Sequence, residues 1–430
     1  MRESLRRRPP LRRLLRDLAR AIAAEGGTVY LVGGFPRNVA EGRDPGDVDL
    51  LVTGLSYRRT GDVLRSLPVK ARGIRKVVAA GRHFPVHRIA VDWGKEYIDV
   101  SNARSGGRPR PRRPGVAPVD DDREAVDDAS KRDFTVNSLL FRLHPDRGVE
   151  DGLLLDPFGG IDDVRGKRIR CVGKAEDRFL EDPLRIVRAI RLRNDRRGFV
   201  LDPATASVIR RLGPRLLPTV SPDRLSVELV RSLSADPAGT IDDLHRLGLM
   251  KVLLPELGRS TKPQAERIAG RYRFLRRSLG APLPRHLLLG NLLADLPPDR
   301  ALAAARRLRL PNLRSVASTL RCLHTLTHPE TLRFPLAETE SALLSTKDAR
   351  GSVALYHAVR QTGKRPARDL NRFISKCRAT PFIVNGKLLD KNGFPEGPTR
   401  KEILLRVREE TLAGKVNRPI DALRLAESMR

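Results

Sequence analysis

The stretch LVGGFPRNVAEGRDPGDVDL, residues 31–50, decides how the rest of the chain is interpreted. It starts inside an apolar run, passes through a Gly-Gly pair and an arginine, and ends at two aspartates one residue apart. The segments 28–34 and 47–54 are short and apolar, and we expect both to be strands. Asp47 and Asp49 are positions i and i+2 of the second segment, so both carboxylates should point to the same face of the sheet.

Two carboxylates on one sheet face form an oxygen-rich site. Mg²⁺ is commonly held by one or two carboxylates together with phosphate oxygens of a substrate. The adjacent Gly33 and Gly34 would let backbone N–H groups approach a triphosphate, and Arg37 would add a charged donor. Asp99, near the end of a later strand, is a candidate third ligand or base. A solvated strand end is the alternative interpretation of the aspartate pair, but its neighbours favour nucleotidyl transfer with two metal ions.

The flanking sequence predicts a mixed sheet with helices. Residues 76–101 alternate as further strands, and apolar residues at helical spacing predict a helix before the first strand. Residues 122–140 and nearly everything after 174 carry helical spacing, with a turn-rich connector at 154–173. We therefore expect an α+β fold, with an N-terminal α/β unit followed by an all-helical remainder.

The chain is strongly basic. Its 430 residues include 83 Lys and Arg against 51 Asp and Glu, for a net charge of +32. Nucleic acid is the usual partner of such a field, because neutralised phosphates release counterions. Residues 104–118, RSGGRPRPRRPGVAP, predict a mobile basic loop. The three cysteines are scattered, and no apolar stretch reaches the roughly 18 residues of a membrane span, so we expect a cytoplasmic protein without a membrane segment.

Several blocks of the sequence resemble class II tRNA nucleotidyltransferases and bacterial poly(A) polymerases. They occur in the family's order over residues 28–260, and a looser resemblance to the tail of bacterial CCA-adding enzymes covers 382–423. The chain departs from the family at Pro36 and Asn38, where an aliphatic residue and Asp are usual, and at Lys131, where Arg is usual. The blocks are LVGG followed by Arg37, DVDLLVTG (47–54), KRDFTVNSLL (131–140), DPFGG (156–160), RFLEDPLRIVRAIR (178–191) and SPDRLSVELVRS (221–232).

The resemblance implies a polymerase-β-like head at residues 1–165, a helical neck that selects the nucleotide at 166–225, a helical body at 226–335 and a helical tail at 336–430. It implies Mg²⁺ as the cofactor, and tRNA or another RNA 3′ end, ATP and CTP as partners. The metal would be bound by Asp47 and Asp49, and Asp99 stays the candidate third ligand or catalytic base that its strand position indicates. The nucleotide-binding residues that the resemblance implies are Gly34, Arg37, Arg132, Arg185 and Arg188. Gly33 and Asp182 are added to them by the glycine geometry of the turn and the hydrogen-bonding chemistry of the EDPLR sequence.

The EDPLR sequence also has a physical interpretation. On one helix Asp182 and Arg185 would be i and i+3 on a shared face, which Arg188 extends. An ionised Asp only accepts hydrogen bonds and an Arg only donates them. Cytosine and adenine each offer an amine beside an unprotonated ring nitrogen, which suits this pair, whereas uracil and guanine do not. The alternative is a surface ion pair within the helix, and the other blocks favour base selection.

The sequence thus predicts a template-independent enzyme that adds C and A from CTP and ATP to the 3′ end of tRNA. A poly(A) polymerase of the same family is the nearest alternative, since AAGRHFPVHRI (79–89) resembles a stretch of bacterial examples. Addition of only CC or only the final A is also open. A non-catalytic RNA-binding protein on the same scaffold is an alternative of another class. The sequence makes no prediction of oligomeric state.

Overall fold

The computed structural model divides into two compact units, Met1–Leu216 and Leu217–Arg430, and each is described by itself. The division falls inside residues 166–225, the range expected for a neck, and the four expected ranges stay a prediction. The basic segment 104–118 lies outside the described residues. The structure describes residues 1–67, 73–81, 85–93, 97–103, 122–258, 261–279, 282–317, 319–320, 379, 383–394, 398–412 and 414–429.

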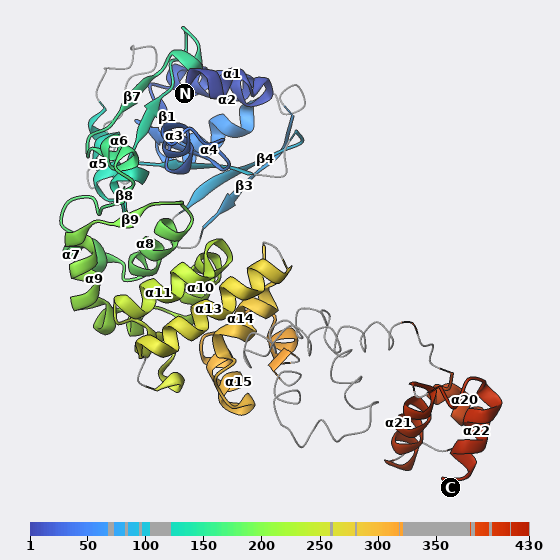
Figure 1. The fold of residues 1–430 in the computed structure, drawn as a ribbon. Coiled ribbons are helices and arrows are strands. Elements are labelled where there is room, and N and C mark those ends of the chain that lie inside the picture. Colours follow the sequence, from blue (N-terminus) through green and yellow to red (C-terminus); the bar gives the residue numbers. More distant parts are fainter. Residues whose placement is uncertain are drawn as a thin grey trace. The chain divides into compact units, whose positions relative to one another are not determined.

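A mixed sheet forms the centre of the first unit (Figure 1). Its strand order is β3-β4-β5-β2-β1-β6-β7. The β2 and β5 strands pair in parallel, and the other neighbours pair antiparallel. The strands are β1 (Thr28–Val32), β2 (Val48–Thr53), β3 (Ile74–Ala80), β4 (Val86–Val91), β5 (Tyr97–Asn102), β6 (Leu140–Arg142) and β7 (Leu153–Leu155). The expected mixed sheet with flanking helices is confirmed.

One face of this sheet packs against the N-terminal helices α1 (Arg2–Arg6) and α2 (Pro9–Ala24) and against α4 (Tyr57–Ser66). Two prolines begin α2, where their missing N–H groups cost nothing. Alternate residues of the strands, among them Leu31 and Leu50, meet this layer. The expected first helix is confirmed, and its buried side chains are Leu11, Leu14, Leu15, Leu18, Ala19 and Ile22.

The opposite face packs against α5 (Arg123–Ser130). Tyr30 and Leu51 join Ala125 and Ala129 of α5 in a second, smaller apolar cluster. Since side chains alternate along a strand, Asp49 lies on the same face as Leu51. The aspartate of β2 therefore faces the α5 side of the sheet.

The helical pattern predicted over 122–140 is only partly correct. The α5 helix ends at Ser130, a single 3₁₀ turn η2 covers Thr135–Asn137, and β6 follows. Leu140 pairs with Val32, which places the end of this block in the sheet beside β1. Tertiary pairing overrides local spacing here, because an apolar segment beside an open strand gains a full hydrogen-bond ladder.

The connector at 154–173 and the segment after it complete the first unit. A short parallel pair joins β8 to β9. The remaining elements of this unit are α3 (Gly34–Ala40), η3 (Val149–Asp151), α6 (Gly160–Arg165), β8 (Arg168–Ile169), α7 (Ala175–Glu181), α8 (Arg185–Asn194), β9 (Val200–Leu201) and α9 (Pro203–Leu216).

The described part of the second unit is helical, as predicted. Buried Tyr272 of α13 donates its hydroxyl to the carbonyl of Leu288 in α14 (2.5 Å), which satisfies the polar group inside an apolar contact. The last three helices share a core of their own around Leu389, Ile403 and Ala422. The elements are η4 (Leu217–Thr219), α10 (Pro222–Ala235), α11 (Pro237–Arg246), α12 (Met250–Leu253), η5 (Pro255–Leu257), α13 (Lys262–Leu279), α14 (Arg285–Leu293), α15 (Pro298–Arg307), α20 (Gly386–Lys391), α21 (Pro398–Leu412) and α22 (Pro419–Glu427).

Candidate active site

Three aspartates gather at one end of β2 and β5. Asp49 is the second residue of β2, and its Cα partner in the parallel strand β5 is Asp99. Asp47 is exposed and lies just before β2, at the position i−2 relative to Asp49. Burial, together with the negative charges of Asp99 and Asp47, raises the pKa of Asp49 to about 6. The fold thus concentrates negative charge here without fully compensating it.

The Gly-Gly turn between β1 and α3 lies against this carboxylate. Gly33 has φ 68°, a conformation that side chains rarely adopt, and Gly34 begins α3. A Cβ on Gly33 would lie 3.3 Å from Oδ2 of Asp49 and 3.6 Å from Nη1 of Arg132. A Cβ on Gly34 would lie 3.4 Å from Nη2 of Arg37. The turn, both arginines and the aspartate, which are separated in the sequence, therefore meet in space.

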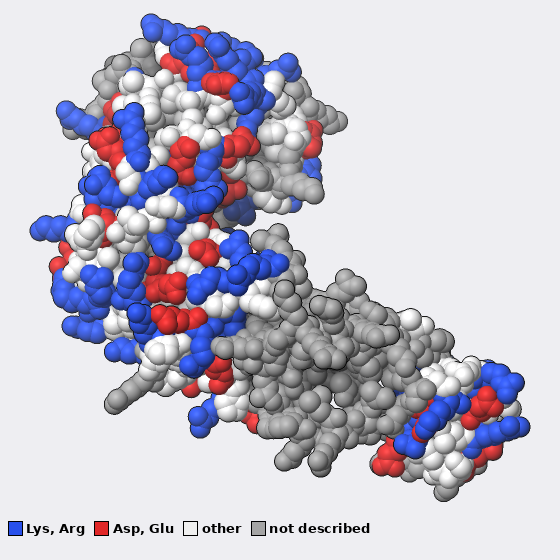
Figure 2. Space-filling model, in the orientation of Figure 1, with Lys and Arg blue, Asp and Glu red and all other residues white. Residues whose placement is uncertain are grey.

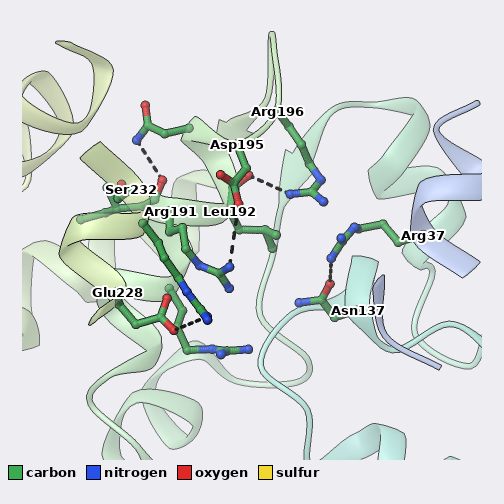
Figure 3. A network of polar contacts seen from close by, with 12 residues as sticks. Arg37, Asn137, Arg191, Leu192, Asp195, Arg196, Glu228 and Ser232 are labelled. Atoms are coloured by element: carbon green, nitrogen blue, oxygen red, sulfur yellow. Dashed lines mark hydrogen bonds and ion pairs between the residues drawn. The ribbon is translucent and has the colours of Figure 1, made fainter. Parts of the chain in front are cut away.

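The two arginines are held in place by polar contacts. Arg132 donates to Asp128 Oδ2 from Nη2 (3.2 Å) and to the carbonyl of Asn137 from Nη1 (3.3 Å). Arg37 donates to the side-chain oxygen of Asn137 and to Oδ1 of Asn38 (2.9 Å from Nη2). Figure 3 shows Arg37 facing Asn137. Positive groups thus approach the acidic end of β2, where they oppose the raised pKa of Asp49.

Asp99 is held by an arginine of the neighbouring strand. Arg88 of β4, its Cα partner, donates to both carboxylate oxygens, from Nε (2.7 Å) and from Nη2 (2.8 Å). Within the described residues, no group of three or more His, Cys, Asp and Glu side chains is arranged to hold a metal ion. A pair of carboxylates such as Asp47 and Asp49 is the number that Mg²⁺ sites often contain when substrate phosphates supply the remaining ligands.

The expectation of one continuous helix through the EDPLR sequence is wrong. Asp182 is an extended residue (φ −148°, ψ 98°) that ends α7, and α8 begins at Arg185. Pro183 explains the break, because a proline disfavours helical geometry at the residue before it. Asp182 accepts from the backbone N–H of Leu184 (3.2 Å), and its carbonyl accepts from the N–H of Arg185 (3.0 Å). The two residues are therefore adjacent through a turn.

The two arginines of α8 make different contacts. Arg185 donates to Glu181 Oε2 (2.7 Å) and to the carbonyls of Arg178 (3.1 Å) and Lys131 (2.9 Å). Arg188 donates twice to Oδ2 of Asp133, at 2.8 and 2.6 Å. Arg188 thus lies at the KRDFTVN turn, whereas Arg185 connects that turn to α7.

Sequence reasoning missed four residues that organise the site. Asp133 and Asn137 lie inside the KRDFTVNSLL block, and that block was the signal that could have identified them. Glu41 and Arg196 form a buried ion pair at 2.7 Å, with side chains 6 % and 5 % exposed. No sequence motif marks this pair, because its two members are 155 residues apart.

The molecular surface is rich in cations. Lys and Arg side chains are spread over the face shown in Figure 2, with fewer acidic side chains between them. A surface of this charge is typical of proteins that associate with a polyanion.

Among the described residues, no helix is both long and apolar enough to cross a bilayer.

Two family models match the chain. The Poly A polymerase head domain matches residues 29–170, and the probable RNA and SrmB-binding site of polymerase A matches residues 198–260. The first match covers the Gly-Gly turn, the aspartates and the KRDFTVN turn. The second begins just after α8.

One curated relative is similar in sequence to nearly the whole chain, and another is similar to about half of it. The chain is 29% identical over 420 residues to the CCA-adding enzyme of Geobacillus stearothermophilus, which covers 95% of this chain and 94% of that protein. It is 33% identical over 233 residues to the Multifunctional CCA protein of Xanthomonas campestris pv. campestris, and there it spans 51% of the relative's length.

Solved structures of similar fold cover nearly the whole chain. One is the Bacillus stearothermophilus CCA-adding enzyme in complex with CTP, with 26% identity, a TM-score of 0.71 and coverage of 98% of both chains. Another is the Thermotoga maritima CCA-adding enzyme complexed with tRNA, with 22% identity, a TM-score of 0.71 and coverage of 99% of this chain and 97% of that one.

Proposed function

The chain belongs to the CCA-adding enzyme and poly(A) polymerase family, and we propose that it adds C and A from CTP and ATP to the 3′ end of tRNA. The observation that carries the proposal is the acidic end of β2, where Asp49 lies among like charges and against the Gly33 turn. Members of this family are nucleotidyltransferases and generally depend on a metal ion.

The reaction joins the terminal ribose hydroxyl of the RNA to the α-phosphorus of the nucleotide. The new O–P bond forms as the bond to pyrophosphate breaks, and the hydroxyl loses its proton. Asp47 and Asp49 would hold Mg²⁺, which when bound activates the hydroxyl and stabilises the leaving pyrophosphate. Asp99 would serve as a further ligand or as the base. Its two oxygens each accept one hydrogen bond from Arg88, which leaves a lone pair on each oxygen for this role.

The triphosphate would be held at the Gly-Gly turn. Backbone N–H groups of Gly33 and Gly34 can approach phosphate oxygens closely because no side chain intervenes. Arg37 and Arg132 would add charged donors from two sides. Both guanidiniums lie at this turn, within 3.6 Å of the positions that a Cβ would occupy there.

Base selection would come from Asp182 and Arg185. The carboxylate of Asp182 accepts from an exocyclic amine, and Arg185 donates to the adjacent ring nitrogen, so cytosine and adenine fit and uracil and guanine do not. The turn between α7 and α8 brings the two residues together without a shared helix face. Arg188, held by Asp133, would support this arrangement.

A poly(A) polymerase activity is the second candidate, because the head matches a family model described as a poly(A) polymerase head. One assay separates the candidates. Purified protein is given tRNA that lacks its terminal CCA, or an unstructured RNA, with each labelled NTP singly and in pairs. Addition of C and then A that stops after three residues supports CCA addition. Long A tracts on either RNA support polyadenylation, and no incorporation with Mg²⁺ supports RNA binding alone.

A further inference from the structure

A closed ring of polar contacts joins three separate segments of the first unit. Arg188 of α8 contacts Asp133, Oδ1 of Asp133 accepts from Asn137 (3.1 Å), and Asn137 accepts from Arg37 of α3. Arg37 lies 3.7 Å from Glu41, and Glu41 accepts from Arg196, two residues after the end of α8. The ring therefore attaches α8 at two points to α3 and to the KRDFTVN turn.

Arg196 contacts Glu41 and Asn38, the two neighbours of Arg37 that lie in α3 or at its end. Its Nε donates to Oε1 of Glu41 (2.7 Å), and its Nη2 donates to Oδ1 of Asn38 (3.4 Å). The same Oδ1 accepts from Arg37, and the same Oε1 is the oxygen nearest to Arg37. Figure 3 shows Arg37 facing Asn137 and Arg196 beside Asp195, whose negative charge also acts on Arg196.

The distribution of charge leaves Arg37 incompletely neutralised. Glu41 is 2.7 Å from Arg196 but 3.7 Å from Arg37, so its charge is directed chiefly to Arg196. Arg37 donates hydrogen bonds to the neutral amide oxygens of Asn38 and Asn137. Burial and repulsion from Arg196 lower the pKa of Arg37 to about 9, because they outweigh the attraction of Glu41 and Asp133.

We propose that the Arg196 and Glu41 pair is a positioning device that holds the Glu41 carboxylate closer to Arg196 than to Arg37, so that Arg37 is available to the triphosphate. The proposal rests on the proposed function, because it takes Arg37 as a ligand of the nucleotide. A buried ion pair is weak evidence for stability alone, since desolvation offsets much of its attraction. Here the pair also connects α3, which carries Gly34 and Arg37, to the end of α8, which begins at Arg185.

Removal of Arg196 tests the proposal. In Arg196→Met, Glu41 is free to form a close ion pair with Arg37, and we expect the KM for both CTP and ATP to rise ten- to a hundredfold, the loss typical of a misplaced binding group. The KM for tRNA should not change. In the double variant Arg196→Met, Glu41→Gln no carboxylate competes for Arg37, so nucleotide affinity should recover at least in part. Arg196→Lys keeps the charge opposite Glu41 and should stay close to the parent protein.

The matched control is Arg197→Met, which removes an exposed cation one residue further along. Direct binding of CTP and of inorganic tripolyphosphate is measured on folded protein in parallel, because this readout does not require transfer. The proposal is overturned if Arg196→Met binds the nucleotide as tightly as the parent protein. It is also overturned if the double variant loses as much nucleotide affinity as Arg196→Met. A parent protein that binds CTP but adds no nucleotide to tRNA would contradict the proposed function and leave this test intact.

Discussion

Asp49, which is half-buried, and Asp133, which is buried, lie in opposite electrostatic surroundings. At Asp49 burial and the nearby Asp99 and Asp47 raise the pKa to about 6. At Asp133 burial alone would raise the pKa, but the charge of Arg188 and hydrogen bonds from Asn137, Arg188 and the N–H of Phe134 lower it overall. The first carboxylate is left with excess negative charge that a cation can neutralise. The second is already neutralised and serves to hold the turn to α8.

The largest effect is expected from removing a metal ligand. Asp47→Ala should lower nucleotidyl transfer by at least about a thousandfold, because metal-assisted charge stabilisation contributes several kcal/mol to the transition state. Affinity for tRNA should stay nearly unchanged. Transfer is measured with labelled CTP, and RNA binding by filter retention. The control is Asp44→Ala, which removes an exposed aspartate that pairs with Arg8. Loss of RNA affinity in place of transfer would contradict the metal role.

The next largest effect is expected from the neutralised aspartate. Asp133→Ala leaves Arg188 without its carboxylate and should lower the free energy of unfolding by about 3 kcal/mol. Urea unfolding measures the change. Asp162→Ala removes an acid whose pair with Arg165 is exposed on both sides, and should stay within about 0.5 kcal/mol of the parent. Equal effects at the two positions would remove the distinction between a neutralised and a surface carboxylate.

At Asp49 we expect removal of the charge to raise the free energy of unfolding, the opposite of its effect at Asp133. Its native pKa of about 6 lies above its unfolded value, so the native state binds more protons than the unfolded state between roughly pH 4 and 6, and ionisation costs stability above that range. Without metal at pH 7, Asp49→Asn should raise the free energy of unfolding by roughly 2 to 3 kcal/mol. The gain should disappear below about pH 4.

Thermal unfolding across pH, with and without Mg²⁺, measures this gain. Mg²⁺ should stabilise the parent protein but not Asp49→Asn, and the stabilisation should weaken as the pH falls through 6, because protons then compete for the carboxylate. Asp62→Asn, in a surface aspartate paired with Arg65, is the control. A destabilised Asp49→Asn would mean that the carboxylate is already compensated.

The smallest effect is expected from Asp182, whose carboxylate would contact the nucleotide base and contributes little to the stability of the fold. Asp182→Ala should relax the choice of nucleotide, with discrimination against UTP and GTP falling about ten- to a hundredfold. Competition between labelled nucleotides measures it. Asp177→Ala, in an exposed residue of α7, is the control. Unchanged discrimination would remove the explanation of the EDPLR sequence given above.

The predictions made from the sequence differ in accuracy for a physical reason. The strands, the first helix and the Gly33 turn follow from side-chain periodicity and glycine geometry, which act over a few residues. Asp49 meets Gly33 because β1 and β2 pair, with Val32 opposite Asp49. Where a segment could form two structures, as at 135–142, the outcome depended on β1, which lies far away in the sequence.

By itself, the sequence determined the acidic pair, the glycine turn before it, the excess of positive charge and the order of the family's blocks. Only the tertiary structure decided that Asp99 pairs with Arg88, that Arg188 is held by Asp133, and that Arg196 meets Glu41 across 155 residues. The reason is that the periodicity of a strand or helix is local, whereas the neutralisation of a buried charge depends on whichever distant segment the folded chain brings to it.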